Sequence, residues 1–260
     1  MLRAGARTVL SGTRFGDVRW FPEVDSTNRW VLEQARAGAP EGLVAVADHQ
    51  TAGRGRLGRT WTAPPGASLL VSVLLRPDLP VECLHLVTAA VALAASDACR
   101  AGAGVEPGLK WPNDLLVGDR KLAGVLAEAD LGSAGGPAVV VGIGINVNWP
   151  DTLPEELEAT ATSLNHVAGR PVDREELLVD LLVGLERRYA GLGREEGRAR
   201  LASEYRARCS TIGRAVRVEL ADESFTGTAC DVNDAGQLLV TTDVCLRTVS
   251  AGDVVHLRPL

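Results

Sequence analysis

Residues 53–61 read Gly53-Arg54-Gly55-Arg56-Leu57-Gly58-Arg59-Thr60-Trp61. The three glycines loosen the backbone of this stretch, and the three arginines keep their positive charge in any protein environment. Guanidinium groups bind phosphate and carboxylate through paired donors, and glycine lets backbone N–H groups approach an anion closely. The stretch therefore indicates a glycine-arginine loop that closes over an anionic ligand. A plain surface loop is the alternative.

The same stretch contains the spacing Gly-x-Gly-x-x-Gly of dinucleotide-binding proteins. That fingerprint requires a strand before it and a helix directly after it. Here the following residues are Thr62-Ala63-Pro64-Pro65-Gly66, and consecutive prolines break a helix. The sequence therefore argues against a Rossmann-type nucleotide site.

Composition limits the functional classes. The chain has 260 residues, 46% of them hydrophobic, and a formal net charge of −6, which suits one large domain plus a small one. The acidic balance argues against nucleic-acid or membrane-surface binding. Five scattered cysteines and four scattered histidines indicate reduced thiols in a cytoplasmic protein, without a zinc site. The longest apolar run, Leu84 to Ala95, is shorter than a membrane span.

The chain is strongly biased toward arginine. Of its 27 basic residues only Lys110 and Lys121 are lysines, and both fall in one short segment. Arginine would serve wherever a generic cation suffices, so we infer that a compact ammonium group is required in this segment.

The hydrophobic pattern predicts an α+β fold in which helices flank a central mixed β-sheet. A helix should begin at Ser26 or Thr27, after capping residues, and a second should cover Leu84 to Arg100. Asp173 resembles the cap of a later helix. Strands are expected at residues 18–21, 43–48, 68–75, 121–128 and 139–147.

From Arg214 onward the pattern changes to short alternating strands, expected at residues 216–220, 224–231, 237–241 and 246–249. These predict a small C-terminal β-barrel of the SH3-like kind. We therefore expect a loose N-terminal segment over residues 1–17, a catalytic domain over 18–212 and a C-terminal barrel over 213–260.

Glycines also interrupt two apolar strands, at Gly124, Gly142 and Gly144. Glycine within a strand weakens it and commonly marks the close approach of a ligand or another segment. These glycines indicate either the floor of a pocket or tight packing of another element.

Together the polar motifs describe a site that activates a carboxylate with a nucleotide. The arginines could neutralise a triphosphate, Trp61 could stack on a base, and Asn113 with Asp114 could hold ribose or magnesium. Lys121 could bridge the carboxylate and the α-phosphate. The expected reaction is adenylyl transfer.

Four motifs in this order resemble biotin protein ligase, the biotin–[acetyl-CoA-carboxylase] ligase family: residues 53–61, Lys110-Trp111-Pro112-Asn113-Asp114, the segment from Lys121 to Glu128, and Gly142-Ile143-Gly144-Ile145-Asn146. The resemblance implies a class II synthetase-like catalytic domain. It also implies that biotin and ATP form biotinyl-5′-AMP, from which biotin passes to a lysine of a biotin carboxyl carrier protein.

The resemblance implies roles for individual residues. The catalytic residues would be Lys121, Arg54 and Arg56. Biotin would contact Ser26, Thr27, Asn28, Gln50, Arg54, Gly55, Arg56, Lys121, Gly124 and Gly142. ATP and the adenylate would contact Arg54, Arg56, Arg59, Trp61, Lys110, Asn113 and Asn146. Asp114 would bind Mg²⁺.

Two departures from the family pattern are visible. The family loop often has arginine where this chain has Leu57, which affects details of the loop more than the activity. About twenty residues precede the first strand, too few for the winged helix-turn-helix of family members that repress transcription, so DNA binding is not expected.

Two other functions stay open at this stage: lipoate-protein ligase, which shares the adenylate chemistry, and a non-catalytic sensor of biotin or nucleotide. The intact lysines argue against the sensor. The sequence leaves open whether the chain forms a homodimer.

The scarcity of lysine predicts little self-modification. After incubation with biotin and ATP, intact-mass spectrometry should show the chain almost entirely without biotin, because few amino groups are available to accept it. Accumulation of several biotin adducts per chain would contradict this expectation.

Overall fold

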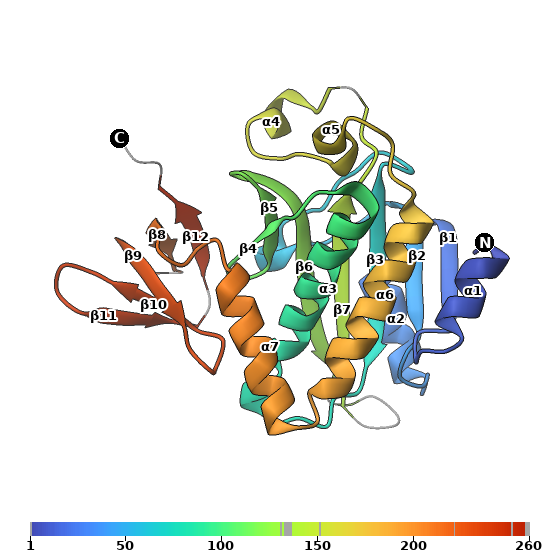
Figure 1. Cartoon of the computed structure of the whole chain (residues 1–260), viewed down its shortest axis with the longest axis horizontal. Helices are drawn as coiled ribbons and strands as arrows, with labels where there is room; N and C mark the ends of the chain where they lie inside the picture. The colour runs from blue at the N-terminus through green and yellow to red at the C-terminus, as the bar shows by residue number, and fades with distance from the viewer. Residues whose placement is uncertain are drawn as a thin grey trace.

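The apolar run at residues 68–75 forms strand β3 (Ser68–Leu75), which is buried along its whole length. It lies in a seven-stranded sheet of order β1-β2-β3-β7-β6-β5-β4 (Figure 1). The computed structural model describes residues 2–257 except 131, 133–136, 151, 221 and 251. The other strands of this sheet are β1 (Val18–Val24), β2 (Val44–Gln50), β4 (Gly108–Lys110), β5 (Asp114–Val117), β6 (Arg120–Asp130) and β7 (Ala138–Asn146). Only the β1–β2 pair is parallel among these described strands, so the sheet is mixed as predicted.

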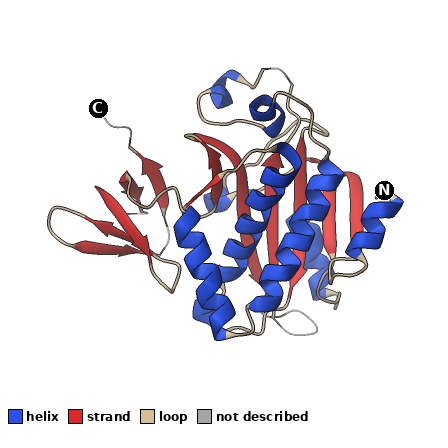
Figure 2. Cartoon of the chain, viewed as in Figure 1, coloured by secondary structure: helices blue, strands red, loops and turns tan. Residues whose placement is uncertain are grey.

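Helices cover both faces of the sheet (Figure 2). On one face lies α2 (Thr27–Arg36), whose N-cap Ser26 accepts a hydrogen bond from the Arg29 N–H, so the predicted start is confirmed. The other face carries α3 (His85–Ala103), α6 (Arg174–Gly191) and α7 (Glu195–Arg208). Asp173 caps α6 as expected. The short helices are η1 (Arg56–Gly58), η2 (Val81–Cys83), α4 (Glu155–Glu158) and α5 (Leu164–Ala168).

The N-terminal segment is ordered, so the prediction that residues 1–17 are loose is wrong for its described part. A helix, α1 (Ala4–Leu10), packs beside α6, and Leu10 and Phe15 are buried in the main core. Arg3 pairs with Asp173 at 2.7 Å. The sequence did not predict this helix because it contains few large apolar residues and they show no helical periodicity. Their burial comes from contact with α6, far along the chain.

Helix α3 and the turn before it, Val81–Ala103, form the one helix within the described residues that is long and apolar enough to cross a membrane. The longest apolar run in the sequence ends at Ala95 and the predicted helix ends at Arg100, whereas α3 continues to Ala103. Within its most apolar 18-residue stretch, 61% is buried, as in the core helix of a folded domain.

The C-terminal segment forms a second, antiparallel sheet of order β11-β10-β9-β8-β12, consistent with the predicted SH3-like fold. Its strands are β8 (Ala215–Glu219), β9 (Ser224–Val232), β10 (Leu238–Thr241), β11 (Leu246–Val249) and β12 (Asp253–His256). The sequence pattern missed β12, which is only four residues long. The division at residues 212–213 stays a prediction. Trp111 of the larger sheet's β4–β5 corner is buried in the C-terminal hydrophobic cluster.

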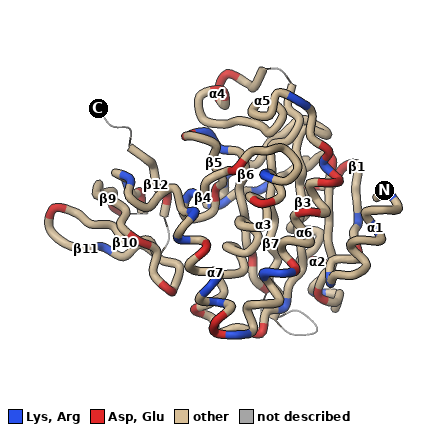
Figure 3. The backbone as a smooth tube through the Cα atoms, viewed as in Figure 1, with Lys and Arg blue, Asp and Glu red and all other residues tan. Residues whose placement is uncertain are grey.

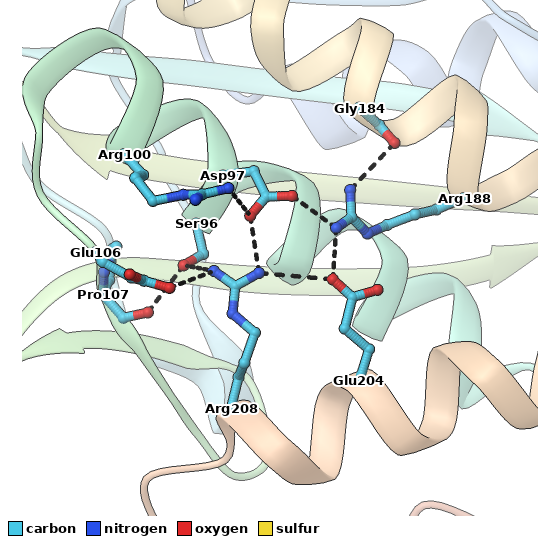
Figure 4. Close-up of polar contacts among 9 residues, drawn as sticks. All are labelled: Ser96, Asp97, Arg100, Glu106, Pro107, Gly184, Arg188, Glu204 and Arg208. Carbon is cyan, nitrogen blue, oxygen red and sulfur yellow. Dashed lines mark hydrogen bonds and ion pairs between the residues drawn. The ribbon is translucent and has the colours of Figure 1, made fainter.

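A network of ion pairs joins α3, α6 and α7 (Figure 4). The carboxylate of Asp97 accepts hydrogen bonds from Arg188 at 2.6 Å and from Arg208 at 2.8 Å. Both arginine side chains are largely buried, at 15% and 18% exposed. Elsewhere basic and acidic residues are mixed along the chain (Figure 3). Asp97 therefore compensates two guanidinium groups at a three-helix junction.

Substituting Asp97→Ala should lower the free energy of unfolding by about 2 kcal/mol, because it leaves two poorly solvated guanidinium groups with fewer partners. Chemical denaturation measures this difference. The control Asp17→Ala removes an exposed ion pair with Arg19 and should change stability by less than about 0.5 kcal/mol. Equal losses in the two variants would contradict the assignment.

The Asp97 contribution should also depend on pH. Burial raises the pKa of this carboxyl, but the hydrogen bonds from Arg188 and Arg208 outweigh burial and hold the pKa below its ordinary value. Such a group stabilises the fold fully above its unfolded-state pKa of about 4 and loses that effect as pH falls through its folded-state pKa. The stability gap between wild type and Asp97→Ala should therefore shrink below about pH 4. A gap that stays constant on acidification would refute this.

Candidate functional site

The glycine-arginine loop (residues 53–61) folds back on itself between β2 and β3. The Gly55 N–H donates to the Arg59 carbonyl at 2.7 Å, and the Trp61 N–H donates to the Gly53 carbonyl at 3.0 Å. A Cβ on Gly53 would lie 2.3 Å from the Trp61 carbonyl oxygen, so glycine is required for this closure. Residues 61–67 are irregular and turn into β3, so the helix of a dinucleotide-binding fingerprint does not follow.

Two arginines of the loop hold polar side chains of the large sheet. Arg54 donates from Nη2 to Glu128 Oε2 on β6 at 2.8 Å. Arg56 donates from Nη1 to Asn113 Oδ1, at the β4–β5 corner, at 3.3 Å. These bonds bring the loop over the strands that carry the other three motifs.

The third arginine of the loop, Arg59, forms an ion pair with Asp253 on β12. This pair connects the loop to the C-terminal sheet. The three guanidinium groups are therefore held by three different elements.

The N-terminus of α2 forms a polar cluster with β2 and β3. Thr27 donates from its N–H and its hydroxyl to Gln50 Oε1, at 2.7 and 3.0 Å. Ser72 Oγ lies 2.7 Å from Thr27 Oγ1 and 2.6 Å from Asn28 Oδ1. Ser26, Thr27 and Asn28 are all buried. The cluster thus presents donors and acceptors in fixed positions at one end of a hollow.

Asn28 connects this cluster to the loop. Its Nδ2 donates to Glu128 Oε2 at 2.8 Å, the same oxygen that accepts from Arg54. The sequence assigned no role to Ser72 or Glu128. The available signal was weak: a lone hydroxyl within an apolar strand and a carboxylate at the end of a motif both need partners that only the fold supplies.

Bare glycine backbone forms the floor of this hollow, whose volume is about 30 Å³. Gly124 and Gly144 are cross-strand neighbours, and the Trp61 ring lies on both. A Cβ on Gly144 would lie 2.7 Å from that ring, and a Cβ on Gly142 would lie 2.1 Å from Asn28 Oδ1. Both alternatives weighed from the sequence therefore apply, since the glycines line a hollow and also accommodate a packed side chain.

Lys121 lies beside this floor, where a Cβ on Gly124 would lie 3.2 Å from its Nζ, and Lys110 is near enough to interact with its charge. Lys121 Nζ lies 2.6 Å from Asp114 Oδ1 and 5.6 Å from the centre of the Trp61 ring. The backbone of Lys121 is fixed by Thr160 and Thr162, through hydrogen bonds of 2.7 and 2.9 Å. Burial lowers the pKa of Lys110, partly opposed by the charge of Asp114. Both lysines, for which the sequence indicated a need for compact ammonium groups, thus lie in a crowded and partly buried part of the site.

A second hollow of about 250 Å³ lies next to the first. It is bounded by the loop, the β4–β5 corner and β12. It shares Arg54, Trp61 and Gly124 with the glycine-floored hollow, and Lys121 also lines it. The two hollows therefore meet at Gly124, where a Cβ would lie 3.2 Å from Lys121 Nζ.

Asn146 is the predicted site residue that the structure does not bring into either hollow. Its Nδ2 donates to the Thr162 carbonyl at 3.0 Å, and Ser68 Oγ lies 3.4 Å from its Oδ1. These bonds occupy a buried amide at the end of β7, so the geometry gives no support to contact with adenosine.

The residues around Asp114 do not fit a resident magnesium ion. The Asp114 carboxylate is paired with Lys121, and Lys110 adds a second positive charge nearby. Within the described residues no group of three or more His, Cys, Asp or Glu side chains could hold a metal ion. Asp114 is better explained as the partner of the lysine.

Comparison with known proteins places this geometry in context. Residues 20–148 match the biotin/lipoate A/B protein ligase family, and residues 211–257 match the biotin protein ligase C terminal domain. The chain is 42% identical over 254 residues to the biotin–[acetyl-CoA-carboxylase] ligase of Mycobacterium tuberculosis, covering 95% of this chain and 91% of that protein. It is 33% identical over 256 residues to the bifunctional ligase/repressor BirA of Bacillus subtilis, covering 97% of this chain and 77% of that protein.

The fold agrees with these matches. The structure resembles the biotin protein ligase of Aquifex aeolicus in complex with biotin and ATP, with a TM-score of 0.81 and 29% identity, covering 94% of this chain and 100% of that chain. These matches confirm both the family and the fold that the sequence motifs predicted. The chain belongs to the biotin protein ligase family.

Proposed function

We propose that the chain is an ATP-dependent biotin–protein ligase. In the first step biotin and ATP form biotinyl-5′-AMP and pyrophosphate. In the second step the biotinyl group passes to the ε-amino group of a lysine in a biotin carboxyl carrier protein, and AMP leaves. The five free cysteines support the expected cytoplasmic location.

One observation carries this proposal: two hollows of different character meet at Gly124, directly beside the Lys121 ammonium group. The smaller has a glycine floor and a polar end at Thr27, whereas the larger is lined by Arg56 and Lys110. A carboxylate entering one hollow and a phosphate entering the other would face each other across the lysine ammonium. Adenylate formation requires this arrangement.

The glycine-floored hollow would bind biotin. Its polar end holds Thr27, Asn28 and Gln50, whose donors and acceptors suit a cyclic urea, and Ser72 joins them. Ligand sites usually exceed about 300 Å³, so this hollow must enlarge when biotin enters. Movement of Trp61 off the glycine floor would provide the space.

The larger hollow would bind the nucleotide. Arg54, Arg56, Arg59 and Lys110 bring positive charge to it, which suits a triphosphate. Gly55 leaves the loop backbone open to close approach by an anion. Trp61 lines both hollows and would offer a face for stacking on the base, and Asn113 would contact the ribose.

Lys121 would act in the first step. A carboxylate oxygen of biotin attacks the α-phosphorus, and the bond from phosphorus to the bridging oxygen of pyrophosphate breaks. Negative charge grows on the α-phosphoryl oxygens, where an ammonium group already held by Asp114 stabilises it without reorganisation. Arg54 and Arg56 would close over the product and exclude water until the carrier arrives.

Magnesium would enter bound to ATP and neutralise part of the triphosphate charge. The pairing of Asp114 with Lys121 leaves the metal to the phosphate groups.

Substituting Lys121→Ala should lower biotin-dependent exchange of pyrophosphate into ATP by at least about 100-fold, because it removes the cation at the point where charge develops. The fold should survive, since the lysine side chain is partly exposed and its backbone bonds to Thr160 and Thr162 remain.

Circular dichroism and thermal unfolding check the fold of this variant. Lys121→Arg is the matched control for charge, and it should also be impaired because the larger guanidinium does not fit the place beside Asp114 and Trp61. Exchange at the wild-type rate in Lys121→Ala would refute the assigned role.

Substituting Gly142→Ala should raise KM for biotin at least tenfold while KM for ATP stays within about twofold. The added Cβ would lie 2.1 Å from Asn28 Oδ1 and would displace that amide from Ser72. The control Gly5→Ala adds the same atom to α1, where nothing lies within 4 Å. Unchanged biotin kinetics in Gly142→Ala would remove biotin from this hollow.

Isothermal titration with biotin and with lipoate tests the choice of substrate. We expect heat from biotin and none from lipoate. Binding of lipoate alone would replace the proposal with the lipoate-ligase alternative.

A further inference from the structure

The ion pair between Arg59 and Asp253 joins the glycine-arginine loop to a strand 194 positions further along the chain. Asp253 is the first residue of β12 and lines the larger hollow together with Val254, Val255 and Glu219. The C-terminal sheet therefore supplies one wall of the proposed nucleotide site.

Strand β12 is itself held against the large sheet by bonds that do not involve the loop. The Trp111 N–H donates to Thr211 Oγ1 at 3.0 Å, and that oxygen lies 2.9 Å from His256 Nε2 on β12. The Trp111 indole N–H donates to the Gly236 carbonyl at 2.9 Å. Asp253 is thus presented from a fixed strand, whereas Arg59 directly follows the three-residue helix η1 in a loop that belongs to neither sheet.

The solvent exposure of the Arg59–Asp253 ion pair indicates whether it stabilises the whole fold or only the loop. The Arg59 side chain is 66% exposed and that of Asp253 is 24% exposed. Ion pairs this accessible contribute little to global stability. A residue that anchors a loop next to a binding hollow instead lowers the entropy that the loop loses when a ligand binds, and so strengthens binding.

We propose that Asp253 is a positioning residue for the nucleotide: through Arg59 it holds the glycine-arginine loop in place before ATP binds. This inference rests on the proposed function. Asp253 acts on ATP more than on biotin, because Arg59 lines the larger hollow and not the smaller one, whereas Arg54, which lines both, keeps its own partner in Glu128.

Steady-state pyrophosphate exchange with the full chain tests the proposal. Asp253→Asn should raise KM for ATP about fivefold, with kcat and KM for biotin within about twofold of wild type. The matched control is Asp243→Asn, the same change at an exposed position in the β10–β11 turn, which should leave all three parameters unchanged.

Two further variants separate positioning from a structural effect. Asp253→Glu keeps the carboxylate and should restore most of the ATP affinity. In an Arg59→Ala background, Asp253→Asn should have no further effect on KM for ATP, because the partner through which it acts is gone. A KM for ATP that is unchanged or lower in Asp253→Asn overturns the proposal, as does an equal loss in both backgrounds.

Limited trypsin digestion without ligand gives a readout that does not need the enzyme to be active. Cleavage after the arginines of the loop should be faster in Asp253→Asn than in wild type and in Asp243→Asn. If wild type shows no biotin-dependent exchange, the proposed function fails, and the digestion alone decides whether Asp253 holds the loop. Equal cleavage rates overturn that anchoring.

Discussion

The site depends on bare backbone in the middle of the large sheet. Gly124, Gly142 and Gly144 lie on strands β6 and β7, where a Cβ would meet the side chains of Lys121, Asn28 or Trp61. Because these positions carry no side chain, a helix N-terminus, a loop tryptophan and a lysine can all approach the same few strand residues. The polar groups of four distant motifs converge for this reason, and the hollow between them is small because Trp61 already lies on two of the glycines.

A second constraint is electrostatic. Acidic side chains from three separate strands hold the positive groups that would receive ATP, which reduces the repulsion between these groups. Glu128 holds Arg54, Asp114 holds Lys121 and Asp253 holds Arg59. Each acceptor comes from a strand rather than from the loop. An entering phosphate or carboxylate therefore meets cations whose positions are already set, which is the condition for electrostatic stabilisation without reorganisation.

The C-terminal sheet takes part in this arrangement. Trp111, which lies within the Lys110–Asp114 motif, is buried in the hydrophobic cluster of the second sheet, and Arg214 pairs with Asp119 of the β5–β6 turn. The corner that carries Lys110, Asn113 and Asp114 is thus packed against the C-terminal sheet. The second sheet supports the site as well as covering it.

The sequence alone determined the elements and the motifs. Apolar runs located β3 and β7, capping residues located the start of α2, and the proline run after the loop excluded a dinucleotide fold, because these signals are local. Tertiary structure decided the rest. The burial of α1, the strand β12, the roles of Ser72 and Glu128, the pairing of Asp114 with Lys121 and the turning of Asn146 toward Thr162 all depend on partners far along the chain. Local periodicity carries no information about such partners, so only packing of the two sheets and their helices could reveal which polar groups meet.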